Sequence, residues 1–204
     1  MNVALTDAVL PVRLRFDRPM TDDELFDFCV ENETLRVERD SNGELILMSP
    51  TGLEGSNWNI KVTTYLTIWA DQIGGGRTFD SNGGFTLPDG SMRSPDAAWM
   101  SQARWDALAR REQQRFGHVS PEFVIEVRSE SDGLAELQDK MKMWIANGVE
   151  LAWLIDPKRR VVEVYRAGEE PEVHEDPTSV QGDGPVRGFE LVMGRVWGFA
   201  HASG

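Results

Sequence analysis

Two carboxylates stand in short apolar segments of the chain, at positions where an uncharged residue would continue the pattern. Asp96 lies in the segment 93–100, and Glu126 lies in the segment 121–129. In the second segment the apolar residues alternate onto one face of an expected strand, so Glu126 and Arg128 share the other face. Mg²⁺ takes oxygen ligands from one or two carboxylates and completes its shell with water and substrate phosphate. If the two segments are neighbouring strands, these residues predict a metal site.

The same residues also have an ordinary structural interpretation. Asp96 follows Pro95, and an aspartate after a proline often serves a turn or a cap. Glu126 and Arg128 could instead form an exposed ion pair, which would be worth less than about 1 kcal/mol. The residues alone leave both interpretations open.

The composition is that of an ordinary soluble globular protein. The 204 residues include 40% apolar and 27% charged residues, and we expect a single domain over residues 1–204. The one cysteine, Cys29, cannot form an internal disulfide, which suits a reducing cytoplasm. We expect no signal peptide, because a basic start before an apolar run is missing, and no membrane helix, because no apolar run approaches about 18 residues. The three histidines are scattered without cysteine partners, which argues against a zinc cluster.

The formal net charge of −13 argues against nucleic-acid binding, because proteins that contact phosphates normally present a basic face. Acidic residues gather in the late segment 169–176, however, and divalent ions can mediate between carboxylates and phosphates. The basic stretch from Arg104 to Arg115 has two interpretations, a phosphate contact or a solvated helix face, and the residues favour the solvated face.

The hydrophobic pattern predicts helices and strands in alternation. Helices are expected over about 21–32, 52–73, 101–111 and 132–147, and strands over about 35–38, 44–48, 77–80, 84–87, 93–100, 121–129, 151–155, 161–165 and 189–192. The acidic segment before the last strand, up to about Pro185, is expected to be a long loop. This order indicates an α/β or mixed α+β fold in which a mixed sheet is flanked by helices.

Residues at the starts and edges of the expected helices predict either helix caps or further members of the candidate site. Thr21 and Glu24 have the spacing of a capping box. Glu54 has two interpretations: three residues after Thr51, it could close a second capping box, or it could supply a third carboxylate to the site. Lys140 lies at the edge of its helix's apolar stripe, so its head could reach over the sheet or could remain at the surface while its stem covers apolar neighbours.

Taken together, these segments resemble a known family. The pair Pro95-Asp96, followed by Glu126 to Arg128, resembles the Pro-Asp … Glu-x-Lys pattern of the PD-(D/E)XK nuclease superfamily. More narrowly, the chain resembles the Uma-type restriction endonucleases, a large bacterial family. The resemblance covers residues 21–199 and leaves residues 1–20 as an N-terminal arm. Its supporting stretches are 48–52, 93–127, 140–148 (KMKMWIANG) and 153–157.

The resemblance implies a restriction-endonuclease-like fold, with a central mixed sheet and helices on both sides. It implies Asp96 and Glu126 as Mg²⁺ ligands, with Mn²⁺ as a substitute, and Glu54 as an additional acidic residue from the first core helix. The superfamily lysine two residues after the glutamate is Arg128 here. Arginine is always charged and cannot accept a proton, although it can stabilise an anion. Lys140, on the following helix, resembles a lysine that has migrated to the same space.

The activity that the resemblance implies is Mg²⁺-dependent endonucleolytic hydrolysis of DNA phosphodiester bonds, in which a bound water attacks the phosphate. Asp96, Glu126, Arg128 and Lys140 are the expected catalytic residues. Two alternatives stay open: a binding or regulatory module that keeps the fold without turnover, and a hydrolase of a small phosphoester. DNA is the expected partner. A homodimer is also expected, because a two-fold pair can cut both strands of a duplex.

Overall fold

Two six-stranded sheets organise the chain, and each belongs to a different unit of the computed structural model. The structure describes residues 11–73, 75–130 and 132–198. Unit 1 comprises Met1–Pro50, Gly83–Ser94 and Leu108–Val119, and unit 2 comprises Thr51–Asn82, Pro95–Ala107 and Ser120–Gly204. The chain therefore passes from one unit to the other several times. The expectation of a single domain stays a prediction.

Unit 1 is built on a sheet with the strand order β1-β3-β2-β6-β5-β8. Neighbouring strands are antiparallel except β5 and β8, which run parallel. The N-terminal arm expected over residues 1–20 supplies β1, although residues 1–10 lie outside the described residues. The strands are β1 Val12–Leu14, β2 Arg36–Arg39, β3 Leu45–Met48, β5 Phe85–Thr86, β6 Met92–Arg93 and β8 Gly117–His118, and the helices are α1 Asp22–Glu31 and α4 Arg110–Gln113.

Helix α1 begins at the predicted capping box, which the structure confirms. The Thr21 hydroxyl accepts a hydrogen bond from the Glu24 backbone N–H at 3.3 Å, and the Glu24 carboxylate accepts one from the Thr21 N–H at 2.8 Å. Leu25 and Phe28 of α1 are buried against the apolar face of the sheet, which includes Leu47. Val37 of β2 and Leu45 and Leu47 of β3 are buried in the same cluster, so unit 1 has its own small core.

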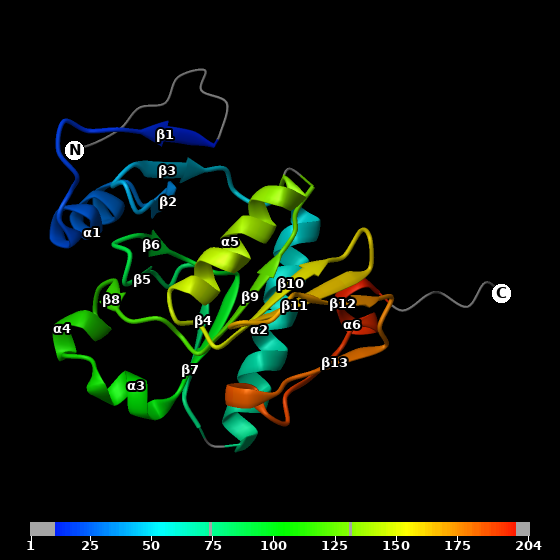
Figure 1. Cartoon of the computed structure of the whole chain (residues 1–204). Helices are drawn as coiled ribbons and strands as arrows, with labels where there is room; N and C mark the ends of the chain where they lie inside the picture. Colours follow the sequence, from blue (N-terminus) through cyan, green and yellow to red (C-terminus); the bar gives the residue numbers. More distant parts are fainter. Residues whose placement is uncertain (1–10, 74, 131, 199–204) are drawn as a thin grey trace. The chain divides into compact units, whose positions relative to one another are not determined.

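Unit 2 is built on a mixed sheet with the strand order β12-β11-β10-β9-β7-β4 (Figure 1). Strands β9 and β10 run parallel, and the other neighbours are antiparallel. The strands are β4 Arg77–Asp80, β7 Ala97–Met100, β9 Phe123–Val127, β10 Leu151–Asp156, β11 Val161–Arg166 and β12 Glu172–Glu175, and a separate pair is formed by β13 Ser179–Gln181 and β14 Glu190–Val192. The predicted mixed sheet is confirmed in this unit, and the second sheet in unit 1 adds to it.

Helices cover both faces of the unit 2 sheet. Figure 1 shows α5 in front of the sheet and the long helix α2 behind it. Leu66 and Trp69 of α2 pack with Phe123 and Ile125, so the predicted apolar face of β9 is the one that α2 covers. The helices of unit 2 are α2 Leu53–Ile73, α3 Gln102–Ala107, α5 Leu134–Ala146 and α6 Gly194–Trp197, with a 3₁₀ turn at Gly184–Val186.

The helix expected over residues 101–111 is wrong in its length. Helix α3 ends at Ala107, and α4 begins at Arg110. Between them Ala109 has an extended backbone (φ −59°, ψ 149°), and its N–H donates to the Glu112 carboxylate at 3.0 Å. A side chain thus caps a new helix where the periodicity alone predicted continuation.

The long loop expected up to Pro185 is also wrong, because this segment contains β12, β13 and the 3₁₀ turn. Its acidic composition favours a loop locally, but strand pairing uses main-chain groups and leaves charged side chains exposed at a sheet edge. Arg166 pairs with Asp183 at 2.6 Å and with Glu172 at 3.2 Å, and these contacts offset part of the acidic charge.

No helix in the part of the chain that the structure describes is long and apolar enough to cross a membrane.

Candidate active site

Asp96 lies immediately before β7 and is 7% exposed. Strand β7 pairs with β9 through Ala97 opposite Ile125, and continuing this register by one residue places Asp96 opposite Glu126. One carboxylate oxygen of Asp96, Oδ2, accepts a hydrogen bond from the Val127 backbone N–H at 2.8 Å. The sheet ladder therefore brings the two predicted carboxylates to neighbouring backbone positions.

The other oxygen of Asp96 is held by a residue that the sequence analysis did not single out. Asn59 of α2 donates from Nδ2 to Asp96 Oδ1 at 2.7 Å. Asn59 stands three residues before Val62 and seven before Leu66, both fully buried. An amide within the buried stripe of an amphipathic helix is the sequence signal that could have identified it.

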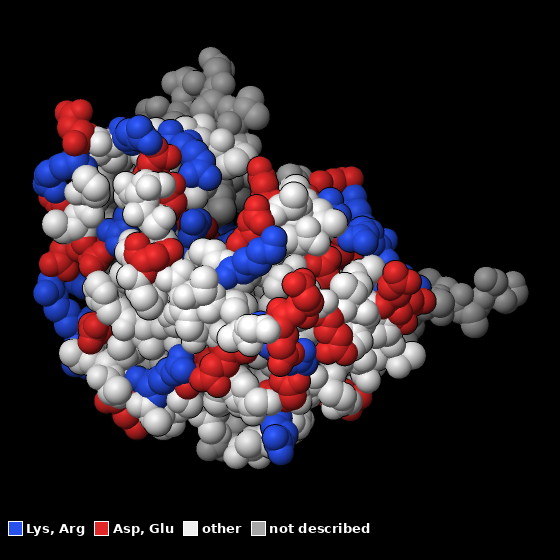
Figure 2. All heavy atoms as spheres, viewed as in Figure 1, with Lys and Arg blue, Asp and Glu red and all other residues white. Residues whose placement is uncertain are grey.

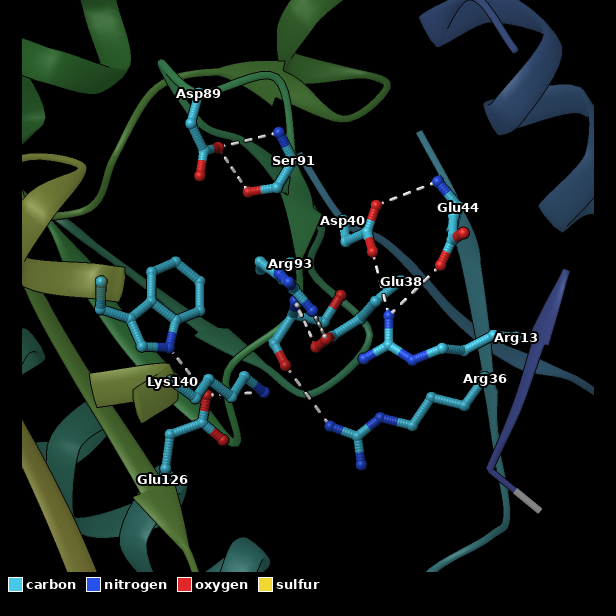
Figure 3. Close-up of polar contacts among 12 residues, drawn as sticks. Arg13, Arg36, Glu38, Asp40, Glu44, Asp89, Ser91, Arg93, Glu126 and Lys140 are labelled. Atoms are coloured by element: carbon cyan, nitrogen blue, oxygen red, sulfur yellow. Dashed lines mark hydrogen bonds and ion pairs between the residues drawn. The ribbon is translucent and has the colours of Figure 1, made fainter. Parts of the chain in front are cut away.

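Glu126 is 3% exposed and is held by α5. Its Oε1 lies 2.8 Å from the Lys140 ammonium and accepts a hydrogen bond from the Trp144 indole N–H at 2.9 Å. Figure 3 shows the head of Lys140 beside the Glu126 carboxylate. A buried carboxylate is stable only when it is paired and hydrogen-bonded, and these two donors meet that requirement.

Helix α5 delivers both donors because Lys140 and Trp144 are four residues apart and therefore share a face. Trp144 and Met141 are fully buried, while the Lys140 side chain is 18% exposed. This placement agrees with the predicted position of Lys140 at the edge of the apolar stripe, with its head over the sheet. The structure thus brings together two of the predicted site residues, Glu126 and Lys140.

Arg128 follows β9 and contacts other groups. Its Nη1 lies 2.7 Å from Asp156 Oδ2, and its Nε donates to the Asp132 carbonyl at 3.1 Å. The alternative of an exposed ion pair between Glu126 and Arg128 is wrong, because Glu126 is buried and Arg128 pairs with Asp156. Asp156 closes β10, the parallel neighbour of β9, so this ion pair ties the ends of the two strands together.

Glu54 lies in the first turn of α2 and is exposed. Its two predicted roles, in a capping box and as a third metal ligand, stay predictions. In residues 11–73, 75–130 and 132–198, no group of three or more histidine, cysteine, aspartate or glutamate side chains is arranged to hold a metal ion.

The donors that the structure does provide are nevertheless suited to a divalent cation. Asp96 and Glu126 supply carboxylate oxygens from backbone positions one residue beyond the paired Ala97 and Ile125. The amide oxygen of Asn59 is buried and has no hydrogen-bond partner among the described residues. Mg²⁺ combines one or two carboxylates with neutral oxygens and water, so these groups are of the chemical type that it takes.

Within unit 1, a buried carboxylate fixes the residues that precede Pro95-Asp96 in the chain. Glu38 is 2% exposed, and its oxygens accept from Arg93 Nη1 at 2.8 Å and from the Ser94 backbone N–H at 3.2 Å. Arg36 Nη2 lies 3.4 Å from the Ser94 carbonyl. Figure 3 shows Arg93 beside the Glu38 carboxylate.

The basic stretch from Arg104 to Arg115 is largely engaged by acidic side chains. Arg104 pairs with Glu122 at 3.0 Å, and Arg111 and Arg115 both pair with Asp23, at 2.5 Å and 3.1 Å. Figure 2 shows acidic and basic side chains interspersed, with acidic ones gathered near α5 and β12. These pairs favour the predicted solvated face over a dedicated phosphate contact.

The mixed sheet between helices defines a restriction-endonuclease-like fold. A crystal structure described as "a putative nuclease belonging to DUF820" from Anabaena variabilis superposes with a TM-score of 0.71. It is 21% identical to this chain and matches over 88% of this chain and 98% of its own length. A family model described as "Uma2: Putative restriction endonuclease" matches residues 22–194.

The chain therefore belongs to the Uma2 family, which confirms the resemblance carried by its motifs. The comparison with curated proteins found no match.

Proposed function

We propose that this protein is an endonuclease that depends on a divalent metal ion and hydrolyses phosphodiester bonds in DNA. The observation that carries the proposal is the pair Asp96 and Glu126, opposed across β7 and β9, with the Lys140 ammonium 2.8 Å from Glu126. The matching family is described as one of restriction endonucleases and the similar crystal structure as that of a nuclease, which supports the same reaction class.

In this proposal Asp96 and Glu126 hold Mg²⁺, or Mn²⁺ in its place, and Glu54 is a candidate third ligand. A divalent cation there supplies an acidified water and polarises the scissile phosphate. Lys140 places a positive charge where negative charge grows on the phosphate, and such preorganised charge is a large contribution to catalysis. Arg128 is the second candidate for this role, but its contact with Asp156 favours Lys140.

A module that binds metal without turnover is the second candidate function. It is favoured by the contacts of Glu126, whose Oε1 is shared by Lys140 and Trp144, and by the pairing of Arg128 with Asp156. The expected homodimer and the cytoplasmic location stay predictions under either function.

Asp96→Asn tests the proposed function, because the change keeps the shape of the side chain and removes its charge. We expect the wild type to bind Mn²⁺ in calorimetry and to nick supercoiled plasmid, and the variant to do neither. Asp139→Asn is the matched control, since Asp139 lies on α5 with a side chain that is 76% exposed. We expect this control to behave as the wild type does.

The two measurements separate the candidate functions. Mn²⁺ binding that depends on Asp96, without nicking of any plasmid or short duplex, would favour the module without turnover. Equal nicking by the wild type and Asp96→Asn would reject the assignment of Asp96 as a metal ligand.

A further inference from the structure

We propose that Asn59 is a positioning residue of the metal site and that its amide oxygen is a neutral ligand of the cation. The amide nitrogen of Asn59 lies 2.7 Å from Asp96 Oδ1, while its oxygen is buried without a hydrogen-bond partner among the described residues. The inference rests on the proposed function, because it concerns how the same site holds its ion.

The donor half of the amide fixes the carboxylate of Asp96. Val127 N–H holds Oδ2 and Asn59 holds Oδ1, so both oxygens are restrained from two directions. One donor belongs to the ladder of β9 and the other to α2. The Thr63 hydroxyl donates to the Asn59 carbonyl at 2.8 Å and lies 3.4 Å from the Asp96 carbonyl, which holds the same turn of α2 beside the start of β7.

The acceptor half of the Asn59 amide, its oxygen, indicates that a further group binds there. A buried polar oxygen without a partner destabilises a fold, so a native protein retains one where a ligand or an ordered water completes its hydrogen bonding. Asparagine carbonyl oxygens are ordinary ligands of hard divalent cations. Asn59 is hydrogen-bonded to Asp96, which is the residue that the proposed function makes a ligand of the cation.

A neutral ligand suits this position better than a charged one. A carboxylate at residue 59 would face Asp96 at hydrogen-bond distance, and two like charges so close disfavour each other unless a cation lies between them. Asparagine supplies the oxygen and donates to Asp96 at the same time. In the metal-free protein, Asn59 and Asp96 therefore form a hydrogen bond and not a contact between like charges.

Two substitutions separate the roles of the donor and the acceptor. Asn59→Ala removes both atoms, and we expect its affinity for Mn²⁺ in calorimetry to fall about 10–100-fold, the range seen when groups that support a metal ligand are lost. Asn59→Asp keeps an oxygen and loses the donor. We expect a lower Tm than the wild type in EDTA and a larger rise in Tm on adding Mn²⁺.

Asn57→Ala and Asn57→Asp are matched controls, because Asn57 lies on the same helix and is exposed. Both should bind Mn²⁺ with wild-type affinity and show the wild-type change in Tm. The inference is overturned if Asn59→Ala binds Mn²⁺ as the wild type does, or if Asn59→Asp responds to Mn²⁺ no more than Asn57→Asp.

The same titrations distinguish failure of this inference from failure of the proposed function. If Asp96→Asn abolishes Mn²⁺ binding while Asn59→Ala leaves it unchanged, only the role of Asn59 is rejected. The hydrogen-bond partner of the Asn59 amide oxygen is then a water and not the cation. If the wild type binds no Mn²⁺, both the metal site and the role of Asn59 are rejected.

Discussion

At the scale of single residues, the partner of Glu126 comes from a helix rather than from its own strand. The superfamily pattern places a lysine two residues after the glutamate, and this chain has Arg128 there. Arg128 is engaged by Asp156, while Lys140 reaches Glu126 from α5. A positive charge therefore lies beside the carboxylate although the motif position holds an arginine that pairs elsewhere.

This arrangement predicts the effect of removing the charge of Lys140. Lys140→Met keeps most of the apolar stem and loses the ammonium. Under the proposed function we expect kcat for plasmid nicking to fall about 10²–10³-fold, the effect of losing one preorganised group that stabilises the transition state. Affinity for Mn²⁺ should be no lower than that of the wild type, because both carboxylates remain and the ammonium beside Glu126 is gone.

Lys142→Met is the control for this prediction. Lys142 lies on the same helix with a side chain that is 66% exposed, and it pairs with Asp139. Nicking by Lys142→Met should match the wild type. Wild-type nicking by Lys140→Met would remove Lys140 from the proposed chemistry.

At the scale of elements, the start of α1 depends on one ionised side chain. Arg18 and the Thr21 backbone N–H both donate to the Glu24 carboxylate, and together they lower its pKa from the ordinary 4.5 to about 2. Because the pKa is lower in the folded state, the stabilisation from Glu24 is complete above pH 4.5 and is lost as the pH falls towards 2.

Glu24→Gln tests this dependence. We expect the variant to unfold at a lower urea concentration than the wild type at pH 7, and the two midpoints to converge as the pH approaches 2. Urea titrations monitored by circular dichroism between pH 2 and 7 give the comparison. A difference in midpoint that is constant with pH would contradict the role of the ionised carboxylate.

The elements that the sequence predicted well are those with strong local signals. The capping box at Thr21, the periodicity of α2 and the alternation in β9 all act within a few residues, and the structure contains each of them. Strand β12 and the break before α4 were not predicted, because they depend on pairing with β11 and on the Glu112 cap. Local composition carries neither kind of information.

The candidate site divides in the same way. The motif pointed to Asp96, Glu126 and Arg128, and the resemblance added Lys140, whose ammonium lies 2.8 Å from Glu126; their catalytic roles stay predictions. Asn59 and Asp156 were missed, since their partners are 37 and 28 residues away in the chain. Only the folded structure shows which distant carboxylate an amide contacts or which distant cation a carboxylate contacts.

At the scale of the whole molecule, the charge of −13 opposes the contact with DNA that the proposed function requires. Arg104, Arg111 and Arg115 already pair with acidic side chains, so they bring little unpaired positive charge to a phosphate. A divalent ion that joins carboxylates to phosphates changes this balance, because its two positive charges offset the negative charge of the carboxylates.

We therefore expect DNA binding to require a divalent ion. Fluorescence anisotropy with a labelled duplex should show weak binding in EDTA and an affinity at least about tenfold higher with Ca²⁺, equivalent to about 1.4 kcal/mol. Asp96→Asn should lose most of this increase. Tight binding by the wild type in EDTA would show that the protein itself supplies the positive surface.

The ladder between β7 and β9 has a consequence for how this protein can change in evolution. The segment that joins the two strands, residues 101–122, includes part of unit 1, and its ends are tied where the Ser101 N–H donates to Glu122 at 3.0 Å. The spacing of Asp96 and Glu126 is set by strand register and not by the length of this connection. The connection can therefore gain or lose residues while the carboxylates stay in place, whereas one residue deleted within β9 would turn Glu126 to the opposite face of the sheet.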